Sequence, residues 1–414
     1  MTLLRYCVAV LLVLLLPVSA AFAGGFQLNE HGTKAMAMGG AFAAQANDPS
    51  AIYFNPAGLA FQNGFHVLAG GTLIAPFSTW TSPTGATETE QVRQVFFPPN
   101  AYVTYGMKNG LAFGVGVFSG YGLGTEWPNP WAGDQLAIKT NLTSFNINPT
   151  VSYAYKDMIS VGVGASYVTS EVKLTRALVV PIGGGRTLKG STYLSGTKGA
   201  WGFSGGLLVK PIKNLSIGAS YRSSIKLDYD GTATFTFPVP QVQALFPGGS
   251  GKTTIKLPDN IFAGIAYEFN PRFTLEGDFQ YIGWSSYDQL SVTLAQGSVP
   301  ASVPLTQTSV KDWKNTWMAR VGAEYRFEPV ALRFGFIYDK TPQPNKSVEP
   351  MLPDANRVEG TVGIGTKIVE HLTLDFAFQF IMFSDRTVTS PENVFPGTYT
   401  NKAYLFGLDI GYNL

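Results

Sequence analysis

The sequence predicts an all-β protein: a transmembrane antiparallel β-barrel of about 14 strands, plugged by an N-terminal hatch. Short polar turns and long irregular loops alternate between segments of alternating polarity, from about residue 64 to Leu414. Only 14% of the residues are charged, against roughly 25% in soluble domains. Beyond the N-terminus, no apolar run reaches the ~18 residues of a membrane helix. Strands that face lipid on one side only explain all three observations.

The chain opens with a predicted secretory signal peptide, residues 1–23. An apolar run from Val8 to Leu16 follows a positive charge, and a small-x-small cleavage site ends at Ala23, so the mature chain is expected to begin at Gly24. The alternative is a transmembrane anchor. Two observations argue against an anchor: the apolar run is short, and no charged stop-transfer segment follows it. The single cysteine, Cys7, lies inside this peptide, so the mature chain is expected to have no disulfide.

Charge and cysteine usage exclude several classes of function. The 29 basic and 27 acidic residues leave the chain nearly neutral, whereas nucleic-acid binding would require a basic stripe. Export without cysteine argues against a disulfide scaffold and against a thiolate metal site. A large secreted β-sandwich is the competing fold class.

Residues 24–63 do not alternate in polarity. The stretch 35–44 consists of small and apolar residues, and turn signals follow at 47–49 and 55–57. This segment is long and apolar for a periplasmic tail, and folded within the lumen it would plug the barrel. A flexible periplasmic extension is the alternative.

Residues 64–414 form the predicted barrel. The segments 215–222, 273–281 and 372–380 place apolar residues on one face and polar, charged or glycine residues on the other. In the last segment, 404–412, the alternate positions are aromatic or aliphatic. A membrane barrel must pair its last strand with its first to remove free edges, and a terminal lipid-facing strand fits that closure.

The connectors between these strands alternate in length. Tight turns are expected at 108–110, 156–157, 211–214, 270–272, 328–329 and 370–371, and long loops at about 76–97, 120–139, 172–198, 231–254, 286–310, 341–356 and 385–399. Six tight turns and seven loops give about 14 strands, an even number as bacterial barrels require. With a periplasmic N-terminus, every long loop lies outside the cell.

Two neighbouring outer loops carry apolar side chains, although loops that face water are normally polar. The residues are Leu178, Val180, Phe235, Phe237, Leu245 and Phe246. Packing of the two loops against each other would explain them, and so would a groove for an apolar ligand. The two interpretations are compatible, because packed loops would build the groove.

A series of short motifs follows in order along the chain: 25–30 (GFQLNE), 55–57 (NPA), 121–127 (YGLGTEW), 220–223 (SYRS), 283–286 (GWSS), 313–317 (WKNTW) and 352–357 (LPDANR). The series resembles a known family, the FadL/TodX outer-membrane transporters of long-chain fatty acids and aromatic hydrocarbons. Their order along essentially the whole mature chain, rather than any one motif, makes the resemblance specific.

The resemblance implies a 14-stranded barrel, in agreement with the connector count, and a route for a hydrophobic ligand. The ligand would be captured at apolar outer loops, pass to an inner pocket and leave sideways through a kink in the third strand. The implied hatch and gating residues are Phe26, Asn55, Pro56 and Ala57, and those of the lateral opening are Phe113, Gly114, Gly116 and Phe118. Glycine inside a strand can mark such a bend. The chain ends in Leu414, where the family commonly ends in Phe.

The resemblance also implies basic residues near the pocket. Arg176 lies where one family arginine falls, and Lys311 or Lys314 would supply the other base. A carboxylate that leaves water needs a charge-assisted partner. The alternative for each of these residues is that it is an ordinary charged side chain in the lumen or in a loop and does not bind the ligand.

Nothing in the sequence predicts catalysis, a cofactor or a metal. His31, His66 and His371 lie beside no serine in a recognisable constellation, and no His-Glu-x-x-His motif occurs. We therefore expect a monomeric transporter in the outer membrane of a Gram-negative cell, with membrane lipids, a hydrophobic ligand and, during biogenesis, the barrel-assembly machinery as partners. The alternatives are a nonspecific porin, a surface antigen or adhesin, and an outer-membrane lipid hydrolase.

Overall fold

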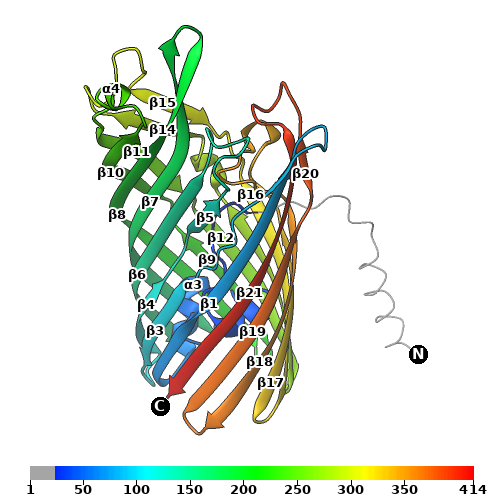
Figure 1. Ribbon diagram of the computed structural model, residues 1–414. Coiled ribbons are helices and arrows are strands. Elements are labelled where there is room, and N and C mark those ends of the chain that lie inside the picture. The colour runs from blue at the N-terminus through cyan, green and yellow to red at the C-terminus, as the bar shows by residue number, and fades with distance from the viewer. Residues whose placement is uncertain (1–23) are drawn as a thin grey trace.

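The computed structural model describes residues 24–414, so the predicted signal peptide lies outside the described part. One antiparallel sheet closes on itself, as predicted, and forms a tall barrel (Figure 1). The first strand, β1 (Gly64–Thr81), pairs with β3 (Pro99–Gly106) on one side and with the last strand, β21 (Gly397–Asn413), on the other. The register runs from His66 opposite Asn413 to Thr81 opposite Thr398, so the closing seam is long and continuous.

Fourteen antiparallel strands make up the wall, and several of them are interrupted and carry two labels. In order they are β1, β3, β4 (Leu111–Phe118) with β5 (Gly122–Glu126), β6 (Lys139–Tyr155), β7 (Ile159–Gly183), β8 (Arg186–Ile212), β9 (Leu215–Arg222) with β10 (Ile225–Thr236), β11 (Gly249–Leu257) with β12 (Asn260–Asn270), β13 (Phe273–Ile282) with β14 (Gln289–Leu294), β15 (Thr306–Val310) with β16 (Thr316–Phe327), β17 (Val330–Asp339), β18 (Arg357–Val369), β19 (Leu372–Phe383) with β20 (Arg386–Val388), and β21. A short β2 (Glu88–Glu90) lies in the first outer loop and pairs with β1.

All six predicted tight turns join consecutive strands at one end of the barrel. The predicted loop 172–198 is instead a β-hairpin, because β7 and β8 stay paired out to Gly183 opposite Arg186. Three glycines with positive φ, at 183–185, form its tip. Likewise β10 and β11 extend into the predicted loop 231–254, which holds the short α4 (Pro240–Gln243). Strand pairing needs only backbone groups, so it continues where the polarity pattern has faded.

The alternation of polarity places the two faces of the wall as predicted. On β13, Glu276, Asp278 and Gln280 are buried in the lumen, whereas Leu275 and Phe279 are exposed on the outer surface. Successive side chains of a strand point to opposite faces. The outer face is therefore apolar and the inner face polar, as a wall between lipid and a filled lumen requires.

The segment 24–63 lies inside the barrel, where Figure 1 shows its first residues in blue. It contains α2 (Thr33–Ala37), α3 (Ala51–Phe54) and the 3-10 helix η1 (Pro56–Phe61), and nearly all of its apolar side chains are buried against the wall. Within residues 24–414, no helix is long and apolar enough to cross a membrane. We call this segment the hatch.

Carboxylates on the wall hold the hatch through its backbone. Asp278 accepts hydrogen bonds from the amides of Phe42 (2.8 Å) and Ala43 (2.9 Å), and Glu276 accepts from Ala44 (2.7 Å) and Gln45 (3.1 Å). A buried amide without a partner would be costly, so these acids satisfy a hatch loop that has no regular structure of its own. Glu276 and Asp278, which face the lumen, therefore bind the hatch.

Candidate functional site

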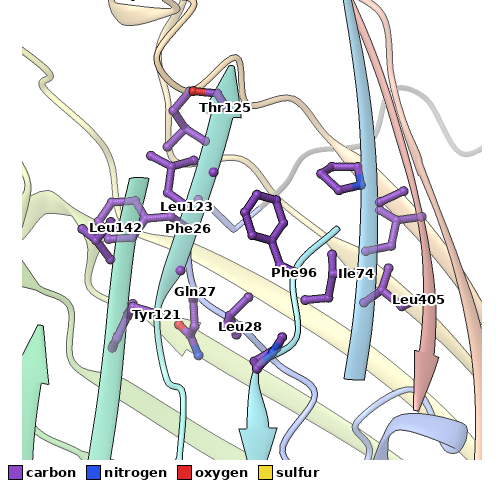
Figure 2. A pocket seen from close by; sticks show the side chains of 18 of the residues that line it. Phe26, Gln27, Leu28, Ile74, Phe96, Tyr121, Leu123, Thr125, Leu142 and Leu405 are labelled. Atoms are coloured by element: carbon purple, nitrogen blue, oxygen red, sulfur yellow. The ribbon is translucent and has the colours of Figure 1, made fainter. Parts of the chain in front are cut away.

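A cavity of about 290 Å³ lies between the N-terminal residues of the hatch and the barrel wall. Figure 2 shows apolar side chains converging on it from several elements: Phe26 and Leu28 of the hatch, Ile74 of β1, Phe96, Leu123 of β5, Leu142 of β6 and Leu405 of β21. We call it the first cavity. A concave, mainly apolar site with a few polar groups is the usual form of a small-molecule site.

The wall is interrupted beside the first cavity. β4 pairs with β3 as far as Phe118 opposite Asn100, and beyond it β5 pairs, among the described strands, with β6 alone. The neighbouring segment 91–98 is held by isolated backbone bonds, such as the 2.9 Å bond from the Phe96 amide to the Ile74 carbonyl. Phe97, which also lines the cavity, is 58% exposed. The cavity therefore reaches the outer surface through a gap in the wall.

The residues predicted for a lateral opening lie next to this gap rather than in it. Phe113, Gly114, Gly116 and Phe118 belong to β4, which is paired without interruption to β3 and β6. The break begins after Phe118, at residues 119–121. The two glycines make room for the hatch, because a Cβ at Gly114 would lie 3.0 Å from Ile52 and one at Gly116 would lie 3.1 Å from it.

The N-terminal end of the hatch fills the break in the wall. The Leu28 amide donates to the Gly120 carbonyl (3.1 Å), and the Gly122 amide donates to the Phe26 carbonyl (3.1 Å). Backbone groups that the wall leaves unpaired are thus paired by the hatch, as buried backbone requires. Any movement of residues 26–28 therefore alters the wall at the gap.

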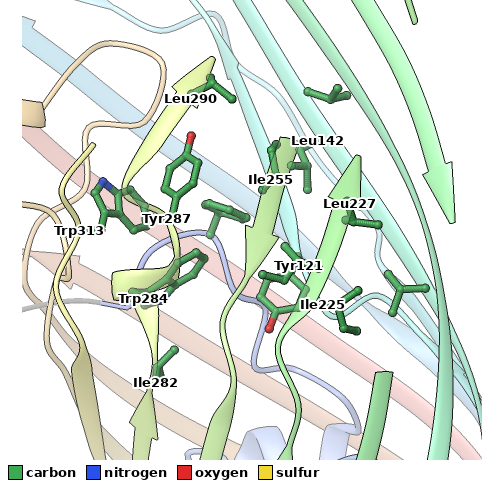
Figure 3. Packing of buried hydrophobic residues seen from close by; sticks show 14 of the residues in the cluster. Tyr121, Leu142, Ile225, Leu227, Ile255, Ile282, Trp284, Tyr287, Leu290 and Trp313 are labelled. Carbon is green, nitrogen blue, oxygen red and sulfur yellow. The ribbon is translucent and has the colours of Figure 1, made fainter. Parts of the chain in front are cut away.

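A second cavity, about 40 Å³, lies on the other side of Phe26. Among its lining residues are Leu142, Ile255, Tyr287, Leu290 and Trp313, which belong to a buried cluster (Figure 3). The Phe26 ring lies 4.6 Å from that of Trp284 and 5.9 Å from that of Trp313, measured between centroids. Phe26, which is 5% exposed, lines both cavities together with Leu123, Leu142 and Leu352, so these side chains lie between the two.

The predicted basic residues occupy three different environments. The Lys311 side chain is 3% exposed, lines the second cavity and forms an ion pair with Glu349. Lys314 is 64% exposed and pairs with Asp312 at 2.5 Å. Arg176 donates to Gln307 and is absent from the lining of both cavities. Of the three, only Lys311 therefore reaches a cavity.

The apolar loop residues come together as one packed cluster. Leu178, Val180, Phe235, Phe237 and Phe246 pack with Leu294 and Val299 of the following loop, while Leu245 stays 58% exposed. The rings of Phe237 and Phe246 lie 4.7 Å apart. The cluster stands at the outer end of β10 and β11. One small pocket shares Leu194 and Val292 with the surroundings of the cluster, and Val172, Leu174 and Thr253 with the second cavity.

The Asn55–Pro56–Ala57 motif ties the hatch to the wall. The Asn55 side chain donates to the carbonyls of Ala43 (2.8 Å) and Leu207 (3.1 Å), and accepts from the Ala57 amide as the cap of η1. Ser160 of β7 donates to the Ala57 carbonyl (2.9 Å). These contacts hold the middle of the hatch, at a distance from both cavities. In the described chain, no three His, Cys, Asp or Glu side chains are grouped as metal ligands.

Two residues that shape the site were not found from the sequence. Phe96 lies in an outer loop that shows no polarity pattern, and Glu349 lies in the loop between β17 and β18. Both reach the cavities because their loops fold inward over the barrel. No local sequence signal marks such a residue, because its position depends on contacts with distant strands.

Comparison with known proteins supports the same fold. A family model described as an outer membrane protein transport protein (OMPP1/FadL/TodX) matches residues 14–414. The long-chain fatty acid transport protein of Escherichia coli K12 is 23% identical, and the 47 kDa outer membrane protein of Pasteurella multocida is 25% identical; each match covers 95% of both chains.

Solved structures with under 25% identity share the architecture. A FadL homologue of Pseudomonas aeruginosa has a TM-score of 0.80 at 19% identity and covers 95% of this chain and 100% of its own. The toluene transporter TbuX of Ralstonia pickettii has a TM-score of 0.71 at 20% identity and covers 92% and 98%. The family match over nearly the whole length confirms the resemblance drawn from the motifs. The chain is an outer membrane β-barrel and belongs to the OMPP1/FadL/TodX family of outer membrane transport proteins.

Proposed function

We propose that this protein takes up hydrophobic compounds by passing them from an outer-loop cluster, through the two cavities, to the gap beside β5 and into the membrane. The observation that carries the proposal is the first cavity, which runs from the buried Phe26 to the exposed Phe97 at a break in the wall. Relatives named as fatty acid and toluene transporters support this substrate range.

The energy for capture comes from burial of apolar surface. Removing each CH2 group from water is worth about 0.8 kcal/mol, so even a short hydrocarbon gains several kcal/mol in a lining of leucine and phenylalanine. Because a deep trap would also hold the ligand, release requires a second state of the site with lower affinity.

Phe26 and its neighbours are the moving part in this proposal. A ligand that passes from the second cavity to the first must displace the Phe26 ring. Residues 26–28 also pair with Gly120 and Gly122 at the break, so the same displacement loosens the gap. The Asn55–Pro56–Ala57 motif keeps its bonds to the wall and acts as the fixed base of the hatch.

The role of the gap as the exit for the ligand can be tested by filling the gap with a larger side chain. A Cβ at Gly124 would meet the Phe96 ring, whereas a Cβ at Gly360 of β18 would meet nothing within 4 Å. We expect Gly124→Leu to reduce uptake of radiolabelled dodecanol to background in cells that depend on this protein, while dodecanol binding to the purified barrel persists. Gly360→Leu is the matched control and should behave like the wild type. Undiminished uptake by Gly124→Leu would refute the sideways exit.

The closed wall also supports a monomer inserted by the barrel-assembly machinery. The seam between β1 and β21 leaves the described sheet without a free edge for a second chain. The route proposed here requires no bond making, so the protein acts as a transporter and not as a lipid hydrolase. A salt conductance in planar bilayers that is large and steady would favour a nonspecific porin instead.

A further inference from the structure

The second cavity contains one positive and one negative side chain. Among the described residues that line it, Lys311 and Glu349 alone are charged, and they form an ion pair. Lys311 is 3% exposed and its ammonium group has little access to water. The rest of the lining is aliphatic or aromatic apart from Thr140, Thr253 and Gln343. The pair therefore gives the cavity a net charge near zero.

The position of Glu349 is set by the folding of its loop. Asn393 donates to the Val348 carbonyl (2.8 Å), Trp127 donates through Nε1 to the Pro350 carbonyl (2.9 Å), and the Leu352 amide donates to the Glu349 carbonyl (3.1 Å). Each residue that flanks Glu349 is thus held by a buried side chain. Because these bonds fix the backbone, the Glu349 carboxylate is held in place beside Lys311 and neutralises its charge.

Arg176 is the other base in the electrostatic field of Glu349. It donates one hydrogen bond to the Gln307 side-chain oxygen and lies outside the lining of the second cavity. A ligand carboxylate that entered the second cavity would therefore find Lys311 already paired. It would either displace an anchored carboxylate or lie beside it, and like charges in a site with little water repel strongly.

The first cavity offers no better partner for an anion. Arg357 lies 3.1 Å from Asp339 and 3.8 Å from Glu359, and it donates to the Gly25 carbonyl. Glu30 and Asp354 also line this cavity. Its remaining base among the described lining residues, Lys402, is exposed on the outer face beside the Phe77 ring, 5.8 Å from the centroid. Among the residues that line the first cavity, acidic side chains therefore outnumber basic ones.

We propose that Glu349 is a specificity-determining residue, which neutralises Lys311 and restricts the inner site to uncharged hydrophobic ligands. The ligand class is therefore hydrocarbons or their alcohols rather than carboxylates. The second cavity, of about 40 Å³, has room only for one end of a ligand, and the rest would lie in the first cavity of about 290 Å³, near the lower end of the ~300–1,000 Å³ usual for small-molecule sites. The inference depends on the proposed function, namely that these cavities hold the transported compound.

The test compares two ligands that differ only in charge. Laurate and dodecanol are titrated at pH 8 into the purified, detergent-solubilised barrel, and binding is followed by tryptophan fluorescence, to which Trp313 and Trp284 contribute. Each affinity is expressed relative to the wild type, so differences in micelle partitioning cancel. Heat-modifiable migration on gels verifies that every variant is folded.

Glu349→Gln should leave Lys311 free for a ligand carboxylate. A hydrogen bond to a charged group is worth enough to raise laurate affinity by about tenfold or more, while dodecanol affinity stays unchanged. The double variant Lys311→Met with Glu349→Gln should return laurate affinity to the wild-type value. Asp312→Asn is the matched control, because it removes the partner of the exposed Lys314 and should change neither ligand.

Three results would overturn the proposal or its basis, and they can be told apart. Unchanged laurate affinity in Glu349→Gln would refute the role of Glu349. A loss of laurate binding in the double variant, relative to wild type, would show that Lys311 already binds carboxylates. This second comparison holds even if Glu349→Gln fails to fold, since replacing both charges leaves no ion unpaired. A folded wild type that binds neither ligand would refute the proposed function itself.

Discussion

The bonds from Glu276 and Asp278 to the hatch allow a quantitative prediction. The double variant Glu276→Gln with Asp278→Asn keeps the size of both side chains and removes their charge. In the wild type the two carboxylates accept from four consecutive amides, those of residues 42–45. Two buried carboxyl groups side by side share a proton, so about one of the two is charged. Hydrogen bonds to a charged group contribute about 1.5–3 kcal/mol and neutral ones about 0.5–1.5, so the two amides bonded to the charged group lose about 1 kcal/mol each.

The sum over these two amides is about 2 kcal/mol, which lowers the ratio of docked to undocked hatch by about thirtyfold. An undocked hatch leaves a polar lumen open to ions. We therefore expect the variant to show frequent open events in single-channel recordings across planar bilayers, where the wild type stays closed. Cleavage of the hatch by protease added on the periplasmic side should increase in parallel.

The next lumen side chain on the same strand provides the control. Gln280 donates to Asn260 within the wall, at 2.7 Å, and makes no hydrogen bond to the hatch, residues 24–63. Gln280→Met should therefore leave conductance and protease resistance at the wild-type level. If the double variant is folded yet as closed as the wild type, the wall carboxylates do not hold the hatch and the reasoning fails.

Three further predictions concern the N-terminal segment and one outer loop. Phe26→Ala removes a ring packed between Trp284 and Trp313, so we expect a local cost of about 3–5 kcal/mol and faster dodecanol dissociation in stopped-flow fluorescence. Gly25 has φ +75°, and a Cβ there would lie 2.7 Å from Trp313, so Gly25→Ala should cost at least about 1–2 kcal/mol and expose residues 24–28 to hydrogen exchange. Hydrogen bonds from Lys314 and Lys346 lower the pKa of Asp312 to about 2, below its usual ~3.9. The stabilising contribution of this contact is thus complete above about pH 4 and lost as the pH falls through 2, which carboxyl-carbon NMR of the labelled barrel can follow.

The barrel itself could be predicted from the sequence. Each strand carries its own alternation, as in Phe273–Tyr281, and each tight turn carries its own polar residues, as at 108–110. Both signals arise between covalent neighbours, because a side chain's face depends only on its position along the strand. Counting turns was therefore enough to predict 14 strands and the side on which the long loops lie.

The outer hairpins and the gap in the wall could not be predicted from such local signals. The pairing of β7 with β8 continues through a segment expected to be a loop, and the break falls at residues 119–121 rather than at the glycines of β4. Where a strand stops pairing depends on what its neighbour does. At the break, the partner is the hatch, whose Phe26 and Leu28 take up the free backbone groups.

Local periodicity and the order of the motifs were enough to predict the closed wall, the plugging segment and the family. The surroundings of the charged groups at the site became known only from the folded structure. The sequence predicted Lys311 as a possible partner for a ligand carboxylate, and only the structure showed that Glu349, 38 residues further along the chain, lies against its ammonium group. The physical reason is that, in a site with little water, the nearest opposite charge determines how strongly a charged side chain can attract a ligand. The folding of the loops decides which opposite charge lies nearest.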